Sequence, residues 1–143
     1  MSTAGPTGTA ARLGIAPGAL VQSIGEDSDG LEIDTDLLDE ILALSGEEII
    51  PEDSDEIVDV VLLWLREDDG DLVDTLMDAR RQLDDAGALW LLTPKPGRDG
   101  HVEPSDVQEA VPTAGLQMTS SVSAAPSWSG SRLVSPKGPG KKR

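Results

Sequence analysis

The residues best suited to binding an anion lie in one short segment of the chain. Residues 93–102 read TPKPGRDGHV and carry Lys95, Arg98 and His101, the only histidine. Lysine and arginine bind carboxylates and phosphates through charge-assisted hydrogen bonds. One interpretation is therefore that Lys95 and Arg98, with His101 beside them, hold a small anionic ligand or a carboxylate or phosphate of a partner protein.

Two acidic segments suggest another interpretation. Residues 25–30 read GEDSDG and residues 66–71 read REDDGD, and each is expected to follow a strand. If these segments meet residues 93–102 at one edge of a sheet, their carboxylates would form an internal rim of salt bridges with the basic side chains. The acidic segments also share some features with calcium loops but lack the full ligand spacing, so we predict no metal site.

His101 is the one candidate for acid-base catalysis. Asp99 or Asp106 could orient its ring, because a carboxylate beside histidine fixes the tautomer. The chain has no cysteine, and no serine or pair of acids stands in a pattern that defines a nucleophile or a general acid. The sequence therefore indicates a protein without a catalytic centre and without a resident cofactor.

The three tryptophans are the only aromatic residues. Trp64 and Trp90 lie in apolar segments and are expected in the core. Trp128 lies in PSWSGS, a predicted hairpin turn, close to Arg132. Two alternatives follow for Trp128: it packs over the edge of the sheet, or it forms with Arg132 an exposed anchor for a protein partner.

Charge is distributed unevenly along the chain. The 27 acidic and 11 basic side chains give a formal net charge of -16, and residues 110–143 hold five of the bases and none of the acids. A body this negative repels phosphate backbones, so we expect no direct binding of duplex nucleic acid. Since neither a membrane-spanning apolar run nor a secretory signal is recognisable, we expect a cytoplasmic protein without membrane contact.

The elements that must position these residues begin with two apolar segments. Residues 57–65 read IVDVVLLWL and residues 88–92 read ALWLL, without the alternation of a half-exposed strand. Strands that are apolar on both faces lie inside parallel sheets covered by helices. Residues 71–83, between them, have the apolar spacing of an amphipathic helix, with Gly87 as the exit from the turn. Asp59 is expected at the mouth of its strand or hydrogen-bonded.

The remaining elements complete a small α/β domain. We predict strands at 19–24 and 48–50, the latter antiparallel or merely extended, helices at 34–45 and 104–111, and a hairpin of 116–124 with 130–135. The predicted fold is a three-layer, Rossmann-like, mostly parallel sheet that ends in an antiparallel hairpin. We expect one domain over residues 12–135, a flexible amino terminus at 1–11 and a flexible basic tail at 136–143.

The order of these elements, from LGIAPGALVQSIG through VDVVLLWL and GALWLLTP to the hairpin, resembles an abbreviated Rossmann-like methyltransferase. In that family the first strand ends in a glycine-rich loop against the cofactor, and an acid after the second strand holds the ribose. The resemblance implies that Gly25 would approach such a ligand and that Glu52 or Asp53 would hold its ribose. Gly25 is a single glycine where the family usually has two or three, and the family's third strand and its helix have no counterpart.

Three longer strings resemble a more specific family. VVLLWLREDDGDLVD, WLLTPKPGRDGHVEPSD and SSVSAAPSWSGSRLVSPK are similar to the actinobacterial domain-of-unknown-function family 3052. The similarity runs from about residue 12 to about residue 137. It implies a small cytosolic protein without an assigned activity, and it supplies no catalytic residue.

The function predicted from the sequence is a non-catalytic protein-interaction or regulatory module whose partner is unidentified. Its surface would be the acidic face of residues 34–56, or that of Lys95, Arg98 and Trp128. One alternative is a protein that binds a nucleotide or an S-adenosylmethionine-like molecule at a degenerate Rossmann-type site beside Gly25. Another is a decoy for basic nucleic-acid-binding proteins, whose complexes moderate salt would dissolve.

Overall fold

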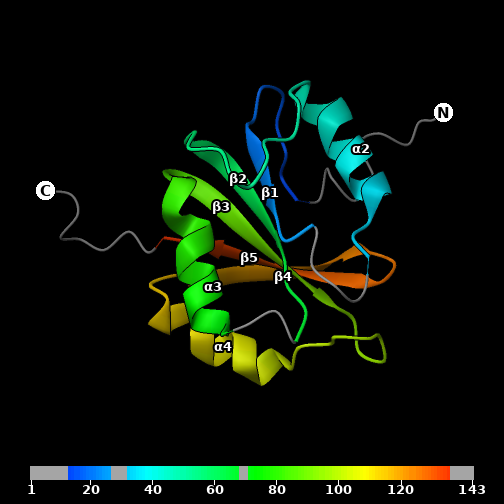
Figure 1. Ribbon diagram of the computed structural model, residues 1–143, viewed down its shortest axis with the longest axis vertical. Coiled ribbons are helices and arrows are strands. Elements are labelled where there is room, and N and C mark those ends of the chain that lie inside the picture. Colours follow the sequence, from blue (N-terminus) through cyan, green and yellow to red (C-terminus); the bar gives the residue numbers. More distant parts are fainter. Residues whose placement is uncertain (1–12, 27–31, 68–70, 136–143) are drawn as a thin grey trace, which may run out of the picture.

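A five-stranded sheet with helices on both faces forms the body of the protein (Figure 1). The computed structural model describes residues 13–26, 32–67 and 71–135. The sequence segments 1–12 and 136–143, which hold the predicted flexible ends, lie outside the described residues. The elements in chain order are β1 (Val21–Ile24), α2 (Thr35–Ser45), β2 (Val58–Trp64), α3 (Leu72–Ala79), β3 (Leu83–Pro94), α4 (Pro104–Thr113), β4 (Gln117–Ala125) and β5 (Trp128–Val134).

The strand order is β1-β2-β3-β5-β4. β2 pairs in parallel with β1 on one side and with β3 on the other, which confirms that the two apolar segments lie side by side and point the same way. β5 is antiparallel to both β3 and β4. The sheet is therefore mixed, with two parallel and two antiparallel pairings, and not mostly parallel as predicted. The reason is that only β1, β2 and β3 precede the hairpin in the described chain, so the hairpin contributes half of the pairings.

The side chains of β2 alternate between two cores. Val60, Leu62 and Trp64 pack with α2 on one face of the sheet, while Val61 and Leu63 pack with α3 and α4 on the other. All five are buried. Burial of each such side chain stabilises the fold by roughly 1.5 to 3 kcal/mol. The layered arrangement expected from a strand that is apolar on both faces is thus confirmed.

Local sequence signals place both ends of α2, whereas α3 and α4 end at other residues than predicted. The helix predicted over 104–111 continues to Thr113, with Pro112 inside it. The Asp34 side chain accepts a hydrogen bond from the Leu37 amide, and Gly46 ends α2 in the left-handed conformation. The helix predicted over 71–83 is shorter: α3 ends at Ala79, a 3₁₀ turn follows, and β3 already begins at Leu83. Gly87, predicted in a turn, therefore lies within a strand.

Two local predictions around β1 can be compared with the structure. Asp59 is exposed, and its Oδ2 accepts a hydrogen bond of 3.0 Å from the Leu20 amide, as expected for an acid at the start of β2. Ile50 makes a single parallel bridge to Gln22. The segment 48–50 is therefore extended but not antiparallel, because it follows α2 and returns in the direction of β1.

Candidate functional site

The carboxyl ends of β1, β2 and β3 meet at one edge of the sheet because the three strands are parallel. Open α/β sheets bind their ligands at this edge. Gly25 follows β1, Arg66 lies two residues after β2, and Lys95 follows β3. The structure thus brings together parts of all three segments selected from the sequence, although residues 27–31 and 68–70 lie outside the described residues.

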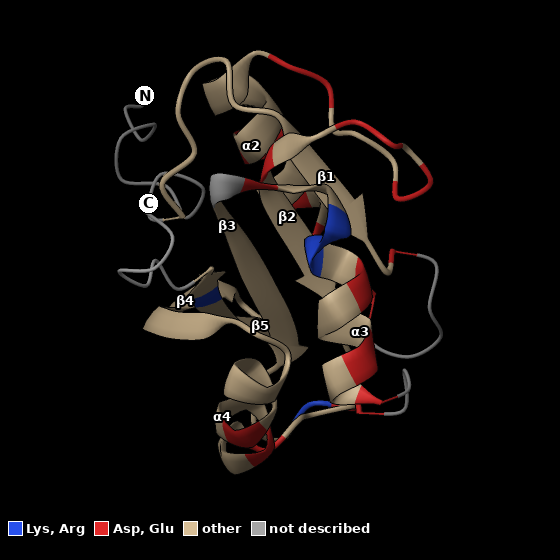
Figure 2. Cartoon of the chain, turned by 90° about the vertical axis from the view of Figure 1, so that its left-hand side faces the viewer, with Lys and Arg blue, Asp and Glu red and all other residues tan. Residues whose placement is uncertain are grey.

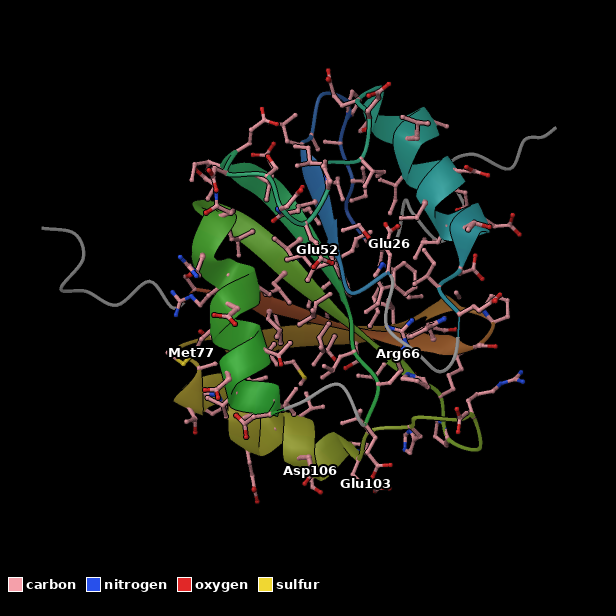
Figure 3. The ribbon with its side chains drawn as sticks, viewed as in Figure 1. Glu26, Glu52, Arg66, Met77, Glu103 and Asp106 are labelled. Carbon is pink, nitrogen blue, oxygen red and sulfur yellow. The ribbon has the colours of Figure 1, made fainter. Side chains whose placement is uncertain are left out.

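Arg66 is the central residue of this edge (Figure 3). Its side chain is only 2% exposed. One guanidinium nitrogen donates to the carbonyl oxygens of Gly25 at 2.7 Å and Trp64 at 3.3 Å. The guanidinium carbon also lies 5.1 Å from the centre of the Trp128 ring, within the range of a cation-π contact. Arg66 therefore links the end of β1 to the end of β2 and to the first residue of β5.

Arg66 was not among the site residues predicted from the sequence. It stands first in an acidic string, REDDGD, and was grouped with the acids that follow it. One signal in the sequence could have identified Arg66, namely its place directly after a strand that is apolar on both faces. A basic side chain in that place is either buried with hydrogen-bond partners or exposed to solvent.

Gly25 has a structural reason to be glycine. Its φ is +91°, and a Cβ added to it would overlap the Trp64 carbonyl oxygen. Its amide donates to Glu52 Oε1 at 2.9 Å and its carbonyl accepts from Arg66. Both backbone groups of Gly25 are thus bonded to the chain itself, whereas the glycine of a nucleotide loop lets the backbone approach the ligand.

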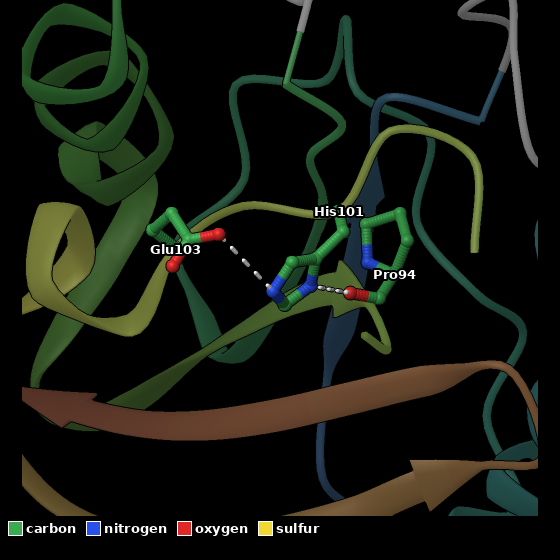
Figure 4. Close-up of polar contacts among 3 residues, drawn as sticks. All are labelled: Pro94, His101 and Glu103. Carbon is green, nitrogen blue, oxygen red and sulfur yellow. Dashed lines mark hydrogen bonds and ion pairs between the residues drawn. The ribbon is translucent and has the colours of Figure 1, made fainter. Parts of the chain in front are cut away.

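The three residues of the basic segment do not form a single cluster. Lys95 is half-buried, and its Nζ donates to Ser123 Oγ at 2.6 Å. Arg98 is exposed, and its side chain makes no ion pair or hydrogen bond within the described part of the chain. His101 Nδ1 lies 2.8 Å from the Pro94 carbonyl oxygen, and its Nε2 lies 3.9 Å from Glu103 (Figure 4). Within the described part of the chain, neither Lys95 nor Arg98 forms a salt bridge. The predicted rim of salt bridges therefore does not include them there.

Trp128 belongs to the core. It is 1% exposed, its Nε1 donates to the Glu32 carbonyl at 3.0 Å, and its ring meets Trp64 edge to face at 5.0 Å. Of the two alternatives for Trp128, the structure thus has the packed one, and the side chain is not an exposed anchor. Arg132 lies four residues further along β5, where it bonds Thr119. Trp128 and Arg132 therefore do not form one exposed surface.

A groove lies beside this edge, between α3 and α4, and we call it the α3–α4 groove. Its volume is about 440 Å³, and its floor contains Leu65, Val102 and Ala110, all buried. Figure 2 shows acidic positions on both α3 and α4. The exposed acids that line the groove come from α4 and from the residues before each helix. They are Glu67, Asp71, Glu103, Asp106 and Glu109.

A second cavity, the β1 pocket, lies at the outer edge of β1. It measures about 540 Å³ and is lined by Ser23, Leu38 and Ile49 together with the acids Glu26 and Glu52. Figure 3 shows both acids near the end of β1. This is the place at which the methyltransferase resemblance puts a ribose-binding acid.

Comparison with known proteins decides the family. The model of a family described as a protein of unknown function (DUF3052) matches residues 10–137. The chain belongs to this family. Uncharacterised relatives of the DUF3052 chain in Mycobacterium bovis and Mycobacterium tuberculosis are 51% identical over 134 residues, which cover 94% of this chain and 82% of theirs.

Solved structures show which fold the DUF3052 chain shares. A methyltransferase from Streptomyces caelestis, CcbJ, matches with a TM-score of 0.59 and 12% identity over 95% of this chain and 91% of its own. A SAM-dependent methyltransferase from Aquifex aeolicus matches with a TM-score of 0.55 and 14% identity over 90% and 88%. At such identities the likeness establishes the Rossmann-like fold alone.

Neither a membrane span nor a metal cluster is found in residues 13–26, 32–67 and 71–135. No helix among these residues is long and apolar enough to cross a membrane. Within the same residues, no three histidine or acidic side chains are grouped so that they could hold a metal ion.

Proposed function

We propose that this DUF3052 protein is a non-catalytic interaction module whose α3–α4 groove binds a basic, amphipathic segment of a partner protein. The observation that carries the proposal is the combination of an apolar floor and five surrounding carboxylates in one groove of about 440 Å³. Exposed acids alone would only make the surface soluble. A concave apolar floor between them gives a partner side chain something to bury.

The charges around the groove favour a cationic occupant. The described lining of the groove holds five carboxylates, the residue Arg66 and the amino ends of α3 and α4, and each helix end contributes about half a positive charge. The guanidinium of Arg66 is bonded to the Gly25 and Trp64 carbonyls. Within the described part of the chain, the carboxylates that line the groove therefore exceed the positive charges by about three.

Lysine and arginine side chains suit such a surface. Their aliphatic stems pack on apolar floors such as that of Leu65 and Val102 while their charged ends reach carboxylates at the rim. Interaction surfaces of this kind gain association rate from the long-range field and affinity from the buried apolar contacts. A neutral segment would gain only the apolar contacts, and an acidic one would be repelled by the field.

A labelled peptide tests the proposal. We expect a short fluorescein-labelled peptide of lysine and leucine to bind in fluorescence anisotropy, and a glutamate-leucine peptide of equal length not to bind. The triple variant Glu103→Gln, Asp106→Asn and Glu109→Gln, which changes three exposed acids on one face of α4, should weaken binding about tenfold, because each lost surface pair contributes roughly 0.5 kcal/mol. Raising the salt concentration should weaken binding to the wild-type chain.

A matched variant separates the groove from the overall charge. Asp36→Asn, Asp39→Asn and Glu47→Gln remove three exposed acids from α2 and the residues after it, on the opposite face of the sheet. This variant should bind the peptide within about twofold of the wild type. Equal weakening by the two triple variants would contradict the proposal, because the peptide would then follow net charge and not the groove.

The second candidate function is small-molecule binding in the β1 pocket. The methyltransferase-like fold and the position of Glu52 beside Gly25 favour it. The engagement of both Gly25 backbone groups by the chain argues against it. For this reason we rank it below peptide binding.

S-adenosylmethionine in a thermal-shift measurement tests this candidate. A ligand present at about a hundred times its dissociation constant adds about 2.7 kcal/mol of stability, which corresponds to a rise in melting temperature of about 9 °C for a chain of this size. Glu52→Gln should remove the rise, while Asp55→Asn, an exposed acid outside the pocket lining, should keep it. No rise with millimolar ligand excludes S-adenosylmethionine as the occupant.

A further inference from the structure

A third cavity differs in chemistry from the other two. It lies between α4 and the face of the sheet formed by β3, β5 and β4, and its volume is about 430 Å³. We call it the hydroxyl groove. Among the described residues, none that lines it is an aspartate or a glutamate, although the chain carries 27 acids. In a chain with a net charge of -16, a groove without acids is a place where an anion meets little local repulsion.

Hydroxyl groups form the floor of the groove. Thr93 of β3 lies directly opposite Ser129 of β5, and Ser129 lies opposite Ser123 of β4. Residues that are directly paired point to the same face of a sheet, so the three hydroxyls form a row across three strands. Ser131 and Ser121 form a second pair next to it.

Most of this hydrogen-bonding capacity is unused. Ser129 and Ser131 are half-buried and Thr93 is 9% exposed. Their hydroxyls make no hydrogen bond to any other part of the described chain. These hydroxyls are open to the groove, so water or a ligand in the groove can bond them.

One cation lies beside the groove and one histidine lines it. Lys95 Nζ donates to Ser123 Oγ at 2.6 Å, so its charge lies at the end of the hydroxyl row. His101 lines the groove, and its Nδ1 carries the hydrogen that bonds the Pro94 carbonyl, because a carbonyl oxygen only accepts (Figure 4). The side chain of Glu103 is 70% exposed, and its Oε2 lies 3.9 Å from His101 Nε2. The groove therefore offers donors and positive charge on one side.

Apolar side chains also line the groove. Val107 of α4 and Met118 of β4 both line it, with Pro104 at the start of the helix. Ligand pockets commonly combine an apolar wall with a few convergent polar groups in volumes of roughly 300 to 1,000 Å³. A bare inorganic ion would leave this wall without a contact.

We propose that the hydroxyl groove binds a small organic anion, whose carboxylate meets Lys95 and the hydroxyl row and whose apolar body packs on Val107 and Met118. The net negative charge of the protein does not prevent this, because charges further away than about 10 Å are screened at 0.1 M salt. The site is separate from the α3–α4 groove, with which it shares only Val102.

Titration with benzoate, followed by ¹H-¹⁵N NMR, tests the proposal. We expect saturable shifts of the amides of Thr93, Ser123, Ser129 and Ser131. Benzyl alcohol has the same ring without the charge and should bind at least about tenfold more weakly, since hydrogen bonds to a charged group contribute about 1.5 to 3 kcal/mol. Inorganic phosphate, which has the charge without the ring, should also bind more weakly than benzoate.

Variants locate the binding. Lys95→Met removes the charge and keeps the length of the side chain, and it should weaken benzoate binding about tenfold. Arg81→Met removes a positive charge from an exposed position in the 3₁₀ turn that follows α3. It should leave the affinity for benzoate unchanged. Ser131→Ala should weaken binding by a smaller factor without unfolding the protein.

Three results would overturn the proposal. The first is an absence of saturable shifts in the hydroxyl groove with benzoate. The second is equal affinity for benzyl alcohol, which would make the groove merely apolar. The third is equal weakening by Lys95→Met and Arg81→Met, which would assign the effect to net charge.

Discussion

Replacing Arg66 with methionine is expected to lower the free energy of unfolding by about 3 kcal/mol. The arginine is 2% exposed and donates to the Gly25 and Trp64 carbonyls. Methionine fills most of the same space but leaves these carbonyls without the donor and removes the cation from the Trp128 ring. Each loss contributes roughly 1 to 3 kcal/mol, and relief from burying a charge offsets part of it.

Chemical denaturation and thermal melting measure this change. The loss corresponds to a fall in melting temperature of about 10 °C for a domain of this size. Arg66→Lys keeps the charge but not the planar donors, so it should lose about half as much. Arg81→Met, at an exposed position, should change stability by less than about 0.5 kcal/mol. If Arg66→Met and Arg81→Met were equally stable, Arg66 would not hold the strand ends together.

The parallel pairing of β2 with β3 could be predicted because it depends on local composition. An unbroken apolar strand has to be covered on both faces, and a sheet with helices on each side is the arrangement that does so. The caps of α2 likewise depend on neighbouring residues, Asp34 and Gly46. The shorter α3 was missed because Arg80 bonds the carbonyls of Ala114 and Gly115, which lie more than thirty residues further along the chain.

The candidate sites were harder to predict because they depend on register. Thr93, Ser129 and Ser123 form a row only in the pairing that β3, β5 and β4 adopt. A shift by one residue would turn each of these hydroxyls to the other face. Trp128 shows the same limit: its position near a turn allowed either an exposed anchor or a packed ring, and contacts with Trp64 and Glu32 decide for packing.

Three features lie at or beside the edge of the sheet that carries ligands in related folds. The end of β1 is bonded internally through Gly25, Glu52 and Arg66. The α3–α4 groove is acidic, and the hydroxyl groove has no acid in its lining. Under the two proposals, one chain binds a basic segment in the first groove and a small anion in the second, and the described linings of the two grooves share only Val102.

Replacing Gly25 with alanine is expected to destabilise the protein by about 4 kcal/mol, since two separate costs add. A positive φ costs an L-residue about 1 to 2 kcal/mol. The new Cβ would also overlap the Trp64 carbonyl oxygen, so the backbone has to move. Moving it would disturb the Glu52 and Arg66 hydrogen bonds to Gly25 as well.

Gly46→Ala supplies the control that separates these two costs. Gly46 has a similar φ of +76°, but a Cβ added there would have nothing within 4 Å, so this variant should lose only about 1 kcal/mol. The difference of about 3 kcal/mol between the two variants in urea denaturation measures the close contact of β1 with β2. Equal losses of unfolding free energy in the two variants would mean that β1 can move away from β2 at Gly25 without an energetic cost. In that case Gly25 would be free to approach a ligand, and small-molecule binding in the β1 pocket would become the stronger of the two proposed functions.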